Sequence, residues 1–171
     1  SVSIIALRAR AIFAEEFNAQ IELRDNKAAV LTEMSLGLLD DLLDGLEPCM
    51  SSAQIRTEIC VVCDKHGGRN RYGPALKFQF PNCLVEVCDE GRQESRYLVQ
   101  CEHVQMDIRF IQGGESFLPA ALASMIAKYF RELAMRLLNA FWQRQVPGLP
   151  PTAGYPVDAK RFKQAIESRQ K

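Results

Sequence analysis

The sequence predicts an α/β fold in which a mixed sheet is flanked by helices, with a long helix near the C-terminus. Three observations predict it. Short segments with the period of strands alternate along the chain with segments that have the period of helices. The length of 171 residues fits a single domain with one core. Residues 119–145 contain no interior glycine or proline and are rich in helix-forming residues, which predicts the longest element.

The first part of the chain predicts a strand and two helices. Residues 7–13 alternate between apolar side chains and polar ones that include two arginines, which is the pattern of a half-buried strand. Residues 14–21 predict a short helix. Asn26 can cap a longer helix over residues 27–46, and its apolar positions recur every three or four residues. The positions expected to face the core are Leu31, Met34, Leu38, Leu42 and Leu46, whereas Asp40, Asp41 and Asp44 should mostly face water.

The middle of the chain predicts the remaining strands. Residues 59–63 form a continuous apolar run rich in β-branched side chains, which is typical of a strand covered on both faces. Further strand candidates are residues 84–87, 97–99 and 104–110. After the long helix, residues 158–169 predict a last helix, because it begins with an acid and ends with basic residues, as the helix dipole favours.

Composition and charge exclude several classes of protein. A hydrophobic content of 47% and a charged content of 25% exclude disordered, collagen-like and coiled-coil chains. No apolar run approaches the length of a membrane helix, and we expect a cytoplasmic protein that does not contact membranes. The zero net charge hides an asymmetry: residues 1–119 carry a net charge of −6 and residues 120–171 a net charge of +6. The last third could meet a polyanion, or the basic excess could serve only solubility.

The six cysteines allow two interpretations. The spacing of Cys60 and Cys63, followed by Cys83 and Cys88, superficially fits a zinc site. However, the period of a strand places Cys60 and Cys63 on opposite faces, and no glycine forms a zinc knuckle. We therefore expect reduced, buried thiols that act as small hydrophobic side chains, with a zinc-stabilised domain as the alternative. The cysteines are Cys49, Cys60, Cys63, Cys83, Cys88 and Cys101.

Two acidic residues stand where a metal-dependent nuclease would need them. Asp64 directly follows an apolar strand, so packing would hold its carboxylate still, and Gly67 and Gly68 allow close backbone approach. Glu115 follows a pair of glycines and precedes the long helix. Hydrolysis of a phosphodiester by two metal ions needs carboxylates that converge from separate elements, so Asp64 and Glu115 are the candidate metal-binding and catalytic residues. The alternative is that Asp64 only starts a turn.

Basic and polar residues near these acids are candidates for holding a nucleic-acid backbone. Arg69 and Arg71 follow in the glycine-rich loop. On the long helix, Ser124, Lys128 and Arg131 are spaced at i, i+4 and i+7, so they share one face. Such a row of hydrogen-bond donors suits the positioning of phosphates. The alternative is a solvated face of the helix on which Lys128 pairs with Glu132.

A likeness to a known family lies in the segment Leu122–Glu132, which reads LASMIAKYFRE. It resembles the signature helix of the type 2 ribonucleases H, in which a run of small residues leads to serine, then Ala-Lys, then arginine followed by an acid, with a methionine like Met135 shortly after. Further segments that agree in order are Glu15-Glu16-Phe17-Asn18 before a helix, Asp64 as the third acid, Glu115 as the fourth acid, which is normally aspartate, and Gly154-Tyr155-Pro156 as the glycine–tyrosine loop.

The resemblance implies a ribonuclease H-like fold and a metal-dependent endonuclease. The implied substrates are RNA in RNA–DNA hybrids and ribonucleotides embedded in DNA. Asp64 and Glu115 would bind Mg²⁺ or Mn²⁺, and Tyr155 would pack against a sugar of the substrate. Residues 124, 128 and 131 would order the site or hold the nucleic-acid backbone.

One departure from the family limits this expectation. The first two catalytic residues of the family lie in a turn like Asp-Glu-Ala-Gly-Arg-Gly, which residues 1–60 lack. We therefore expect residues 1–171 to be one ribonuclease H-like domain that belongs to a longer chain, with little or no nuclease activity as this segment. The alternative is a non-catalytic module on the same scaffold that binds nucleic acid or protein. The oligomeric state is left open.

Overall fold

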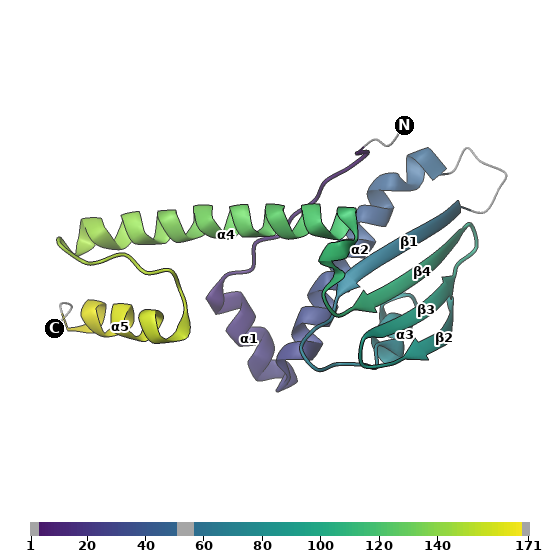
Figure 1. Cartoon of the computed structure of the whole chain (residues 1–171), viewed down its shortest axis with the longest axis horizontal. Coiled ribbons are helices and arrows are strands. Elements are labelled where there is room, and N and C mark those ends of the chain that lie inside the picture. The colour runs from purple at the N-terminus through teal and green to yellow at the C-terminus, as the bar shows by residue number, and fades with distance from the viewer. Residues whose placement is uncertain (1–3, 51–56, 169–171) are drawn as a thin grey trace. The chain divides into compact units, whose positions relative to one another are not determined.

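The computed structural model describes the backbone of residues 4–50 and 57–168, and the side chains of all of these except 47–50. The chain divides into two compact units, Ser1–Ala121 and Leu122–Lys171. The boundary falls within the long helix α4, Leu118–Gln145 (Figure 1). None of the described helices combines the length and the apolar character needed to cross a membrane.

The first unit is built on a mixed sheet. Its described strands are β1 (Thr57–Asp64), β2 (Leu84–Glu90), β3 (Glu94–Gln100) and β4 (Val104–Ile111), in the spatial order β1-β4-β3-β2. β2, β3 and β4 pair antiparallel, whereas β1 pairs parallel with β4, with Asp64 opposite Ile111. Because β1 and β4 run in the same direction, the residues that follow these two strands lie at the same end of the sheet, where both strands finish.

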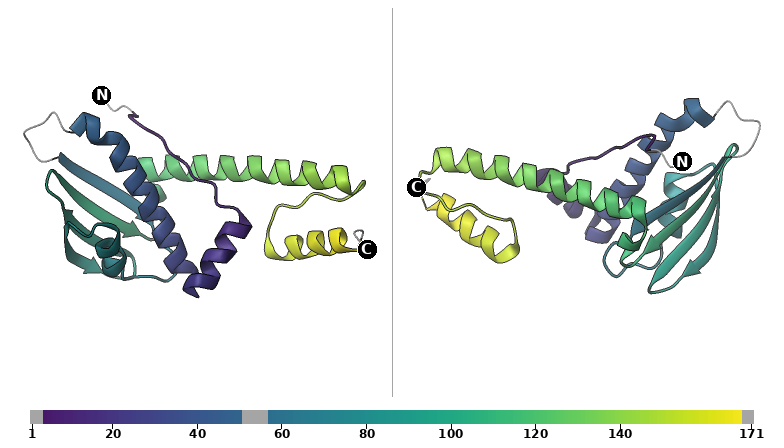
Figure 2. Two further views of the ribbon diagram at one scale, coloured as in Figure 1. Left: turned by 180° about the vertical axis from the view of Figure 1, so that it is seen from behind. Right: turned by 45° about the horizontal axis from the view of Figure 1, so that its top comes forward.

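Helices cover one face of this sheet. The helices of the first unit are α1 (Ala14–Arg24), α2 (Lys27–Met50) and α3 (Gly73–Gln79), and α2 crosses the sheet in Figure 2. The ring of Tyr72, which directly precedes α3, stacks on Phe110 of β4 with 3.6 Å between ring centroids. The buried core of this unit consists of Leu36, Tyr72, Leu76, Phe80, Val85, Tyr97, Val99, Met106, Ile108 and Phe110.

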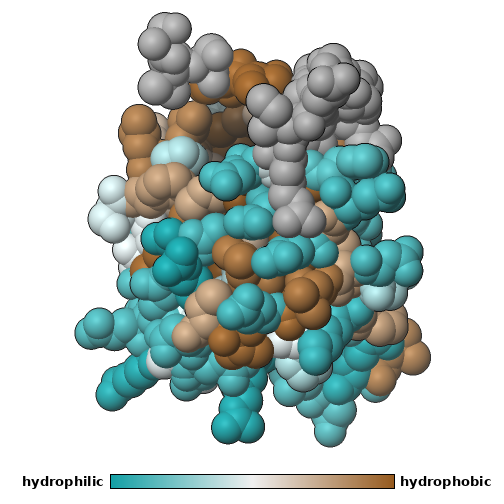
Figure 3. Space-filling model, turned by 90° about the vertical axis from the view of Figure 1, so that its right-hand side faces the viewer, coloured by the Kyte–Doolittle hydropathy of each residue, from teal (hydrophilic) through white to brown (hydrophobic). Residues whose placement is uncertain are grey.

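The other face of the sheet carries charged side chains. The side of the molecule drawn in Figure 3 shows hydrophilic and hydrophobic residues interspersed. On this face Asp107 of β4 accepts hydrogen bonds from Arg109 of the same strand and from Arg96 of β3, the latter with Nε–Oδ1 and Nη2–Oδ2 distances of 2.9 Å. The guanidinium of Arg109, and next that of Arg96, lower the pKa of Asp107 to about 2.

The second unit contains most of α4 and the helix α5 (Pro156–Glu167). It has a small core of its own, formed by Val146, Leu149, Phe162 and Ile166 with Trp142 packed against them. The connection between the two helices, residues 146–155, therefore supplies part of this core rather than only linking the helices.

Much of the sequence-based fold is confirmed: an α/β protein with a mixed sheet, helices and a long helix near the C-terminus. The helix predicted over 27–46 begins as expected, because the Oδ1 of Asn26 accepts hydrogen bonds from the N–H groups of Ala28 and Ala29. The last helix begins at Pro156, two residues before the predicted start. The short helix α3 was not predicted, and only the proline at its first turn indicates it.

The strand predicted over residues 7–13 is wrong. Residues 4–13 have no regular secondary structure, and most of them are exposed. Arg10 instead pairs with Glu16 of α1, with an Nη2–Oε1 distance of 2.6 Å. An alternating pattern makes a strand only where a neighbouring strand pairs with its backbone, and no strand of the described ranges 4–50 and 57–168 pairs with these residues.

Two predictions of burial are also wrong. The face of α2 that meets the core carries Leu36, Leu39 and Leu43, whereas the expected Leu31 is 39% exposed. Both sets recur at helical spacing, so the pattern alone did not separate them. β1 is covered on one face only, because Cys60 on the opposite face is exposed at the edge of the sheet.

The prediction of buried, reduced thiols is wrong for several cysteines. Cys83 and Cys101 form a disulfide, and Cys60 and Cys88 are exposed. Cys63 fits the prediction, since its burial raises the pKa of the thiol to about 11. The zinc alternative is wrong as well, because the sulfur of Cys83 is bonded to that of Cys101. The side chain of Cys49 lies outside the described residues.

Candidate functional site

Asp64 and Glu115 lie at the same edge of the sheet. Asp64 is the last residue of β1, and β4 leads through Gly113, at a φ of 72°, into the short 3-10 helix Gly114–Ser116. The N–H of Gly114 points to the Oδ1 of Asp64, with an N–O distance of 3.5 Å. Both acidic side chains are exposed. Carboxylate oxygens are the ligands that hard cations such as Mg²⁺ and Mn²⁺ prefer, so these two residues are the candidates for such an ion.

No larger set of ligands surrounds them within the described ranges. There, no three His, Cys, Asp or Glu side chains lie close enough together to hold a metal ion.

The loop that follows Asp64 is held by Lys65. Its Nζ donates to the Oδ1 of Asn70 at 2.8 Å, to the carbonyl of Gly91 at 2.6 Å and to the hydroxyl of Ser95 at 3.0 Å. Burial lowers the pKa of Lys65. Since an ammonium has three donors, these bonds satisfy all of them and tie the loop to the β2–β3 hairpin.

His66 ties the same loop to α2. Its Nδ1 lies 3.0 Å from the hydroxyl of Thr32, and its Nε2 lies 3.2 Å from that of Ser35. Burial, and next the charge of Arg69, lower the pKa of His66, which favours the neutral form of the ring. In that form the ring carries one donor and one acceptor, which suits its two hydroxyl partners. Sequence reasoning missed this contact, and the available signal was the two hydroxyl residues three positions apart on one helix.

The two arginines of the loop differ in their surroundings. Arg69 donates to the hydroxyl of Thr32 at 2.9 Å and to the carbonyl of Arg71 at 3.0 Å, and its guanidinium lies 5.6 Å from the centre of the Tyr72 ring. Arg71 is 86% exposed at its side chain and lies 3.6 Å from Glu90. Arg69 therefore holds the loop, whereas Arg71 can turn toward an anionic ligand.

A second group of predicted residues lies on α4 and the loop before α5. Ser124, Lys128 and Arg131 share one face of the continuous helix, as predicted. Arg131 donates to the carbonyl of Ala153 at 2.6 Å, and its guanidinium lies 5.2 Å from the centre of the Tyr155 ring. Tyr155 is 65% exposed. The structure thus pairs a cation with an accessible aromatic ring, an arrangement that suits a sugar or a base next to a phosphate.

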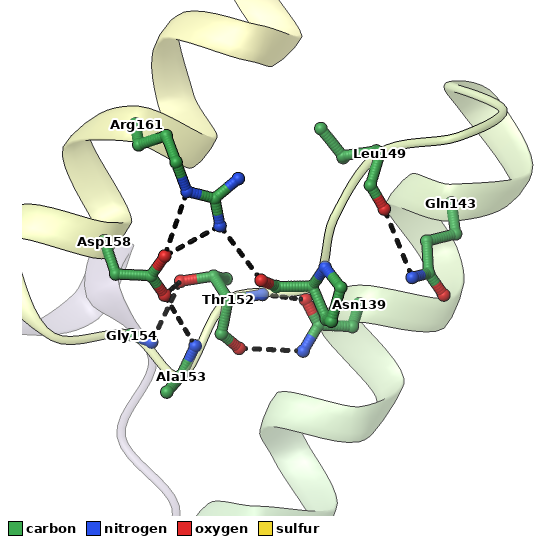
Figure 4. Close-up of polar contacts among 9 residues, drawn as sticks. Asn139, Gln143, Leu149, Thr152, Ala153, Gly154, Asp158 and Arg161 are labelled. Atoms are coloured by element: carbon green, nitrogen blue, oxygen red, sulfur yellow. Dashed lines mark hydrogen bonds and ion pairs between the residues drawn. The ribbon is translucent and has the colours of Figure 1, made fainter.

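The loop that carries Tyr155 is fixed by polar side chains from both helices (Figure 4). Asn139 of α4 exchanges two hydrogen bonds with the backbone of Thr152, and Asp158 of α5 accepts from the hydroxyl of Thr152 and from Arg161. The hydrogen bond from the hydroxyl of Thr152, and next that from Arg161, lower the pKa of Asp158 to about 2. Sequence reasoning missed this cluster, and the available signal was an aspartate in the first turn of the last helix.

The candidate residues fall into two sets, one in each unit. Asp64, Glu115, Arg69 and Arg71 belong to Ser1–Ala121, and Ser124, Lys128, Arg131 and Tyr155 belong to Leu122–Lys171. Comparisons with protein-family models, curated proteins and solved structures find no match for this chain. A functional interpretation therefore rests on the chain's own residues and on the resemblance of its motifs.

Proposed function

We propose that the chain is part of a ribonuclease H-like, metal-dependent endonuclease that cuts RNA in RNA–DNA hybrids or DNA at embedded ribonucleotides. The observation that carries the proposal is the parallel pairing of β1 with β4, which brings Asp64 to the turn that precedes Glu115. The signature-like segment Leu122–Glu132 and the loop with Tyr155 support the same reading.

In this proposal Asp64 and Glu115 bind Mg²⁺ or Mn²⁺ through their exposed carboxylates. The bound ions would supply an activated water and offset charge on the leaving oxygen. Arg71, whose contact with Glu90 is long at 3.6 Å and whose side chain is largely exposed, would turn to a phosphate of the substrate. A metal pair needs further carboxylates, and the resemblance assigns them to an acidic turn that residues 1–60 lack.

In the second unit, Tyr155 and Arg131 provide contacts for the sugar-phosphate backbone. The ring of Tyr155 offers an apolar face to a sugar, and beside it lies the guanidinium of Arg131, whose Nη1 also donates to Glu132 at 2.7 Å. A phosphate of the backbone would compete with Glu132 for this guanidinium. Ser124 and Lys128 extend the same face of α4. These residues bind and orient the nucleic acid and take no part in the chemical step.

The test is cleavage of a labelled RNA–DNA hybrid, and of DNA with a single ribonucleotide, by the natural full-length polypeptide with Mg²⁺ or Mn²⁺. We expect Asp64→Asn to abolish nicking while the circular dichroism spectrum stays unchanged. Asp41→Asn is the matched control, because Asp41 is an exposed aspartate of α2, and it should cleave like the wild type. Near-wild-type cleavage by Asp64→Asn would remove Asp64 from the mechanism.

The segment of residues 1–171 provides a second test in the same assay. We expect little or no cleavage by this segment alone, since two carboxylates cannot hold the metal pair that four can. Robust cleavage by residues 1–171 would show that the site has been misplaced.

A second candidate function is a non-catalytic module that binds nucleic acid. The specific observation in its favour is the net charge of +6 in residues 120–171, together with the exposed Tyr155 beside Arg131. Phosphate contacts release counterions, so binding of an RNA–DNA hybrid should weaken steeply as salt rises. Salt-dependent binding by a full-length protein that cleaves nothing would favour this function, and absence of binding at low salt would exclude it.

A further inference from the structure

The loop between α4 and α5 is anchored on one side by Asn139. The Nδ2 of Asn139 donates to the carbonyl of Thr152, and its Oδ1 accepts from the N–H of Thr152, both at 2.8 Å. This pair of bonds uses the whole amide of the side chain against a single backbone position. Because both the N–H and the carbonyl of Thr152 are bonded to one side chain of α4, Thr152 can neither slide nor turn relative to that helix without breaking a hydrogen bond.

Asp158 anchors the same stretch from α5. Its Oδ2 accepts from the hydroxyl of Thr152 at 2.6 Å and from the N–H of Ala153 at 2.8 Å, and its Oδ1 accepts from Arg161 at 2.7 Å. Arg161 also donates to the carbonyl of Pro151 at 2.9 Å. A carboxylate that receives several donors forms strong, charge-assisted bonds, so three consecutive residues are held by one acid and its arginine.

The residues that follow this anchored stretch carry the candidate contacts. Ala153 accepts the hydrogen bond of Arg131, and Gly154 adopts a φ of 76°. A Cβ at Gly154 would lie 3.2 Å from the side chain of Met135, so the loop lies close against α4 at this point. Tyr155 comes next, with its ring beside Arg131 and open to solvent.

We infer that Asn139, Thr152, Asp158 and Arg161 form a positioning cluster that holds Tyr155 against Arg131 to receive the sugar-phosphate backbone of a nucleic acid. This inference rests on the proposed function. The second unit already has an apolar core, to which Trp142 of α4, Leu149 of the connection and Phe162 of α5 contribute. The positioning cluster does not belong to this core. It holds residues 151–153, which lie shortly before Tyr155 in the chain. Holding the pair in its binding geometry before the ligand arrives lowers the entropy lost on binding.

The test measures binding of a fluorescein-labelled RNA–DNA hybrid by fluorescence anisotropy, without divalent metal so that no cleavage occurs, on the full chain. We expect Tyr155→Ala to raise Kd about tenfold, in line with the stacking of one ring. Asp158→Asn should raise Kd about fivefold by loosening the loop. In the Tyr155→Ala background, Asp158→Asn should have no further effect, because a residue that acts through Tyr155 has nothing left to position.

Glu167→Gln is the matched control for charge. Glu167 is an exposed acid of the same helix, and among the described residues it pairs with Lys163 at 3.6 Å. Removing either acid makes the protein more positive, so a pure charge effect predicts tighter binding of the hybrid for both variants. Weaker binding for Asp158→Asn and unchanged or tighter binding for Glu167→Gln therefore separate positioning from charge.

Amide hydrogen exchange supplies a readout that does not depend on the ligand. The N–H groups of Thr152 and Ala153 donate within the cluster, so Asp158→Asn should speed their exchange while Glu167→Gln leaves it unchanged. Slowed or unchanged exchange in Asp158→Asn would overturn the inference, as would an effect on Kd that adds fully to that of Tyr155→Ala.

The binding results distinguish failure of the inference from failure of the proposed function. If Tyr155→Ala weakens binding and Asp158→Asn does not, the positioning role is wrong and the proposed function stands. If the wild-type protein does not bind the hybrid at low salt, both are wrong.

Discussion

Removal of one hydroxyl from the core should destabilise the first unit strongly. Tyr97 is fully buried; its hydroxyl accepts the N–H of Tyr72 at 2.8 Å and donates to the Oε1 of Glu90 at 2.7 Å. Tyr97→Phe leaves the buried N–H of Tyr72 without this acceptor, which costs about 1 to 3 kcal/mol. Loss of the bond to Glu90 adds roughly 1 kcal/mol, because that carboxylate is partly exposed and keeps Arg71 as a partner. We expect a total loss of about 2 to 4 kcal/mol in the free energy of unfolding.

Urea unfolding followed by far-UV circular dichroism measures this loss, and the fluorescence of Trp142 follows the second unit separately. Tyr129→Phe is the matched control, because the ring of Tyr129 is 63% exposed on α4, and it should change the free energy of unfolding by less than about 0.5 kcal/mol. A Tyr97→Phe variant as stable as this control would refute the assignment of the hydroxyl as the acceptor of the buried N–H.

Three further predictions concern stability. Gly154→Ala should lower the free energy of unfolding by about 1 to 2 kcal/mol, because Gly154 has a positive φ. Gly37→Ala should raise it by about 0.5 to 1 kcal/mol, because Gly37 lies in α2 with open space around it. Thermal unfolding compares the two variants, and equal effects would contradict the geometry. Replacing Cys83 and Cys101 by serine should lower the free energy of unfolding by about 3 kcal/mol, given their separation of 18 residues. A urea midpoint that does not shift would argue against the disulfide. The pKa of Asp107 lies below its unfolded value, so its ion pairs stabilise the fold fully above about pH 4 and lose this effect progressively as the pH falls through the folded pKa of about 2. Asp107→Asn should therefore cost about 1 to 2 kcal/mol at pH 7 and less than about 0.5 kcal/mol near pH 2, and an equal cost at both pH values would contradict this.

The elements with strong local signals were predicted well from the sequence. α4 was recognised because nothing in its interior breaks a helix, and α2 because Asn26 can cap it, as its bonds to the next backbone N–H groups show. β4 was recognised from its alternation, and Met106, Ile108 and Phe110 are its buried side chains.

Features that depend on tertiary neighbours were not predicted. Residues 7–13 have the alternation of a strand and no pairing partner, and the disulfide between Cys83 and Cys101 requires the register of β2 against β3, which no local pattern contains. Likewise, the bonds of Asp158 to Thr152 and Ala153 depend on how a loop folds back onto α5. Asp64 and Glu115 could be proposed as candidates from their positions in the sequence and from the resemblance, but no local pattern contains the parallel pairing of β1 with β4 that puts them at one end of the sheet.

The most direct test of the central claim is a titration with Mn²⁺ followed by NMR, since this paramagnetic ion broadens the signals of nuclei close to it. Our account predicts that the amide signals of Lys65, Gly114 and Glu115 broaden first, and that Asp64→Asn removes this selectivity. Broadening that centres instead on Asp41 and Asp44 of α2, or that Asp64→Asn leaves unchanged, would contradict a metal site at the end of β1.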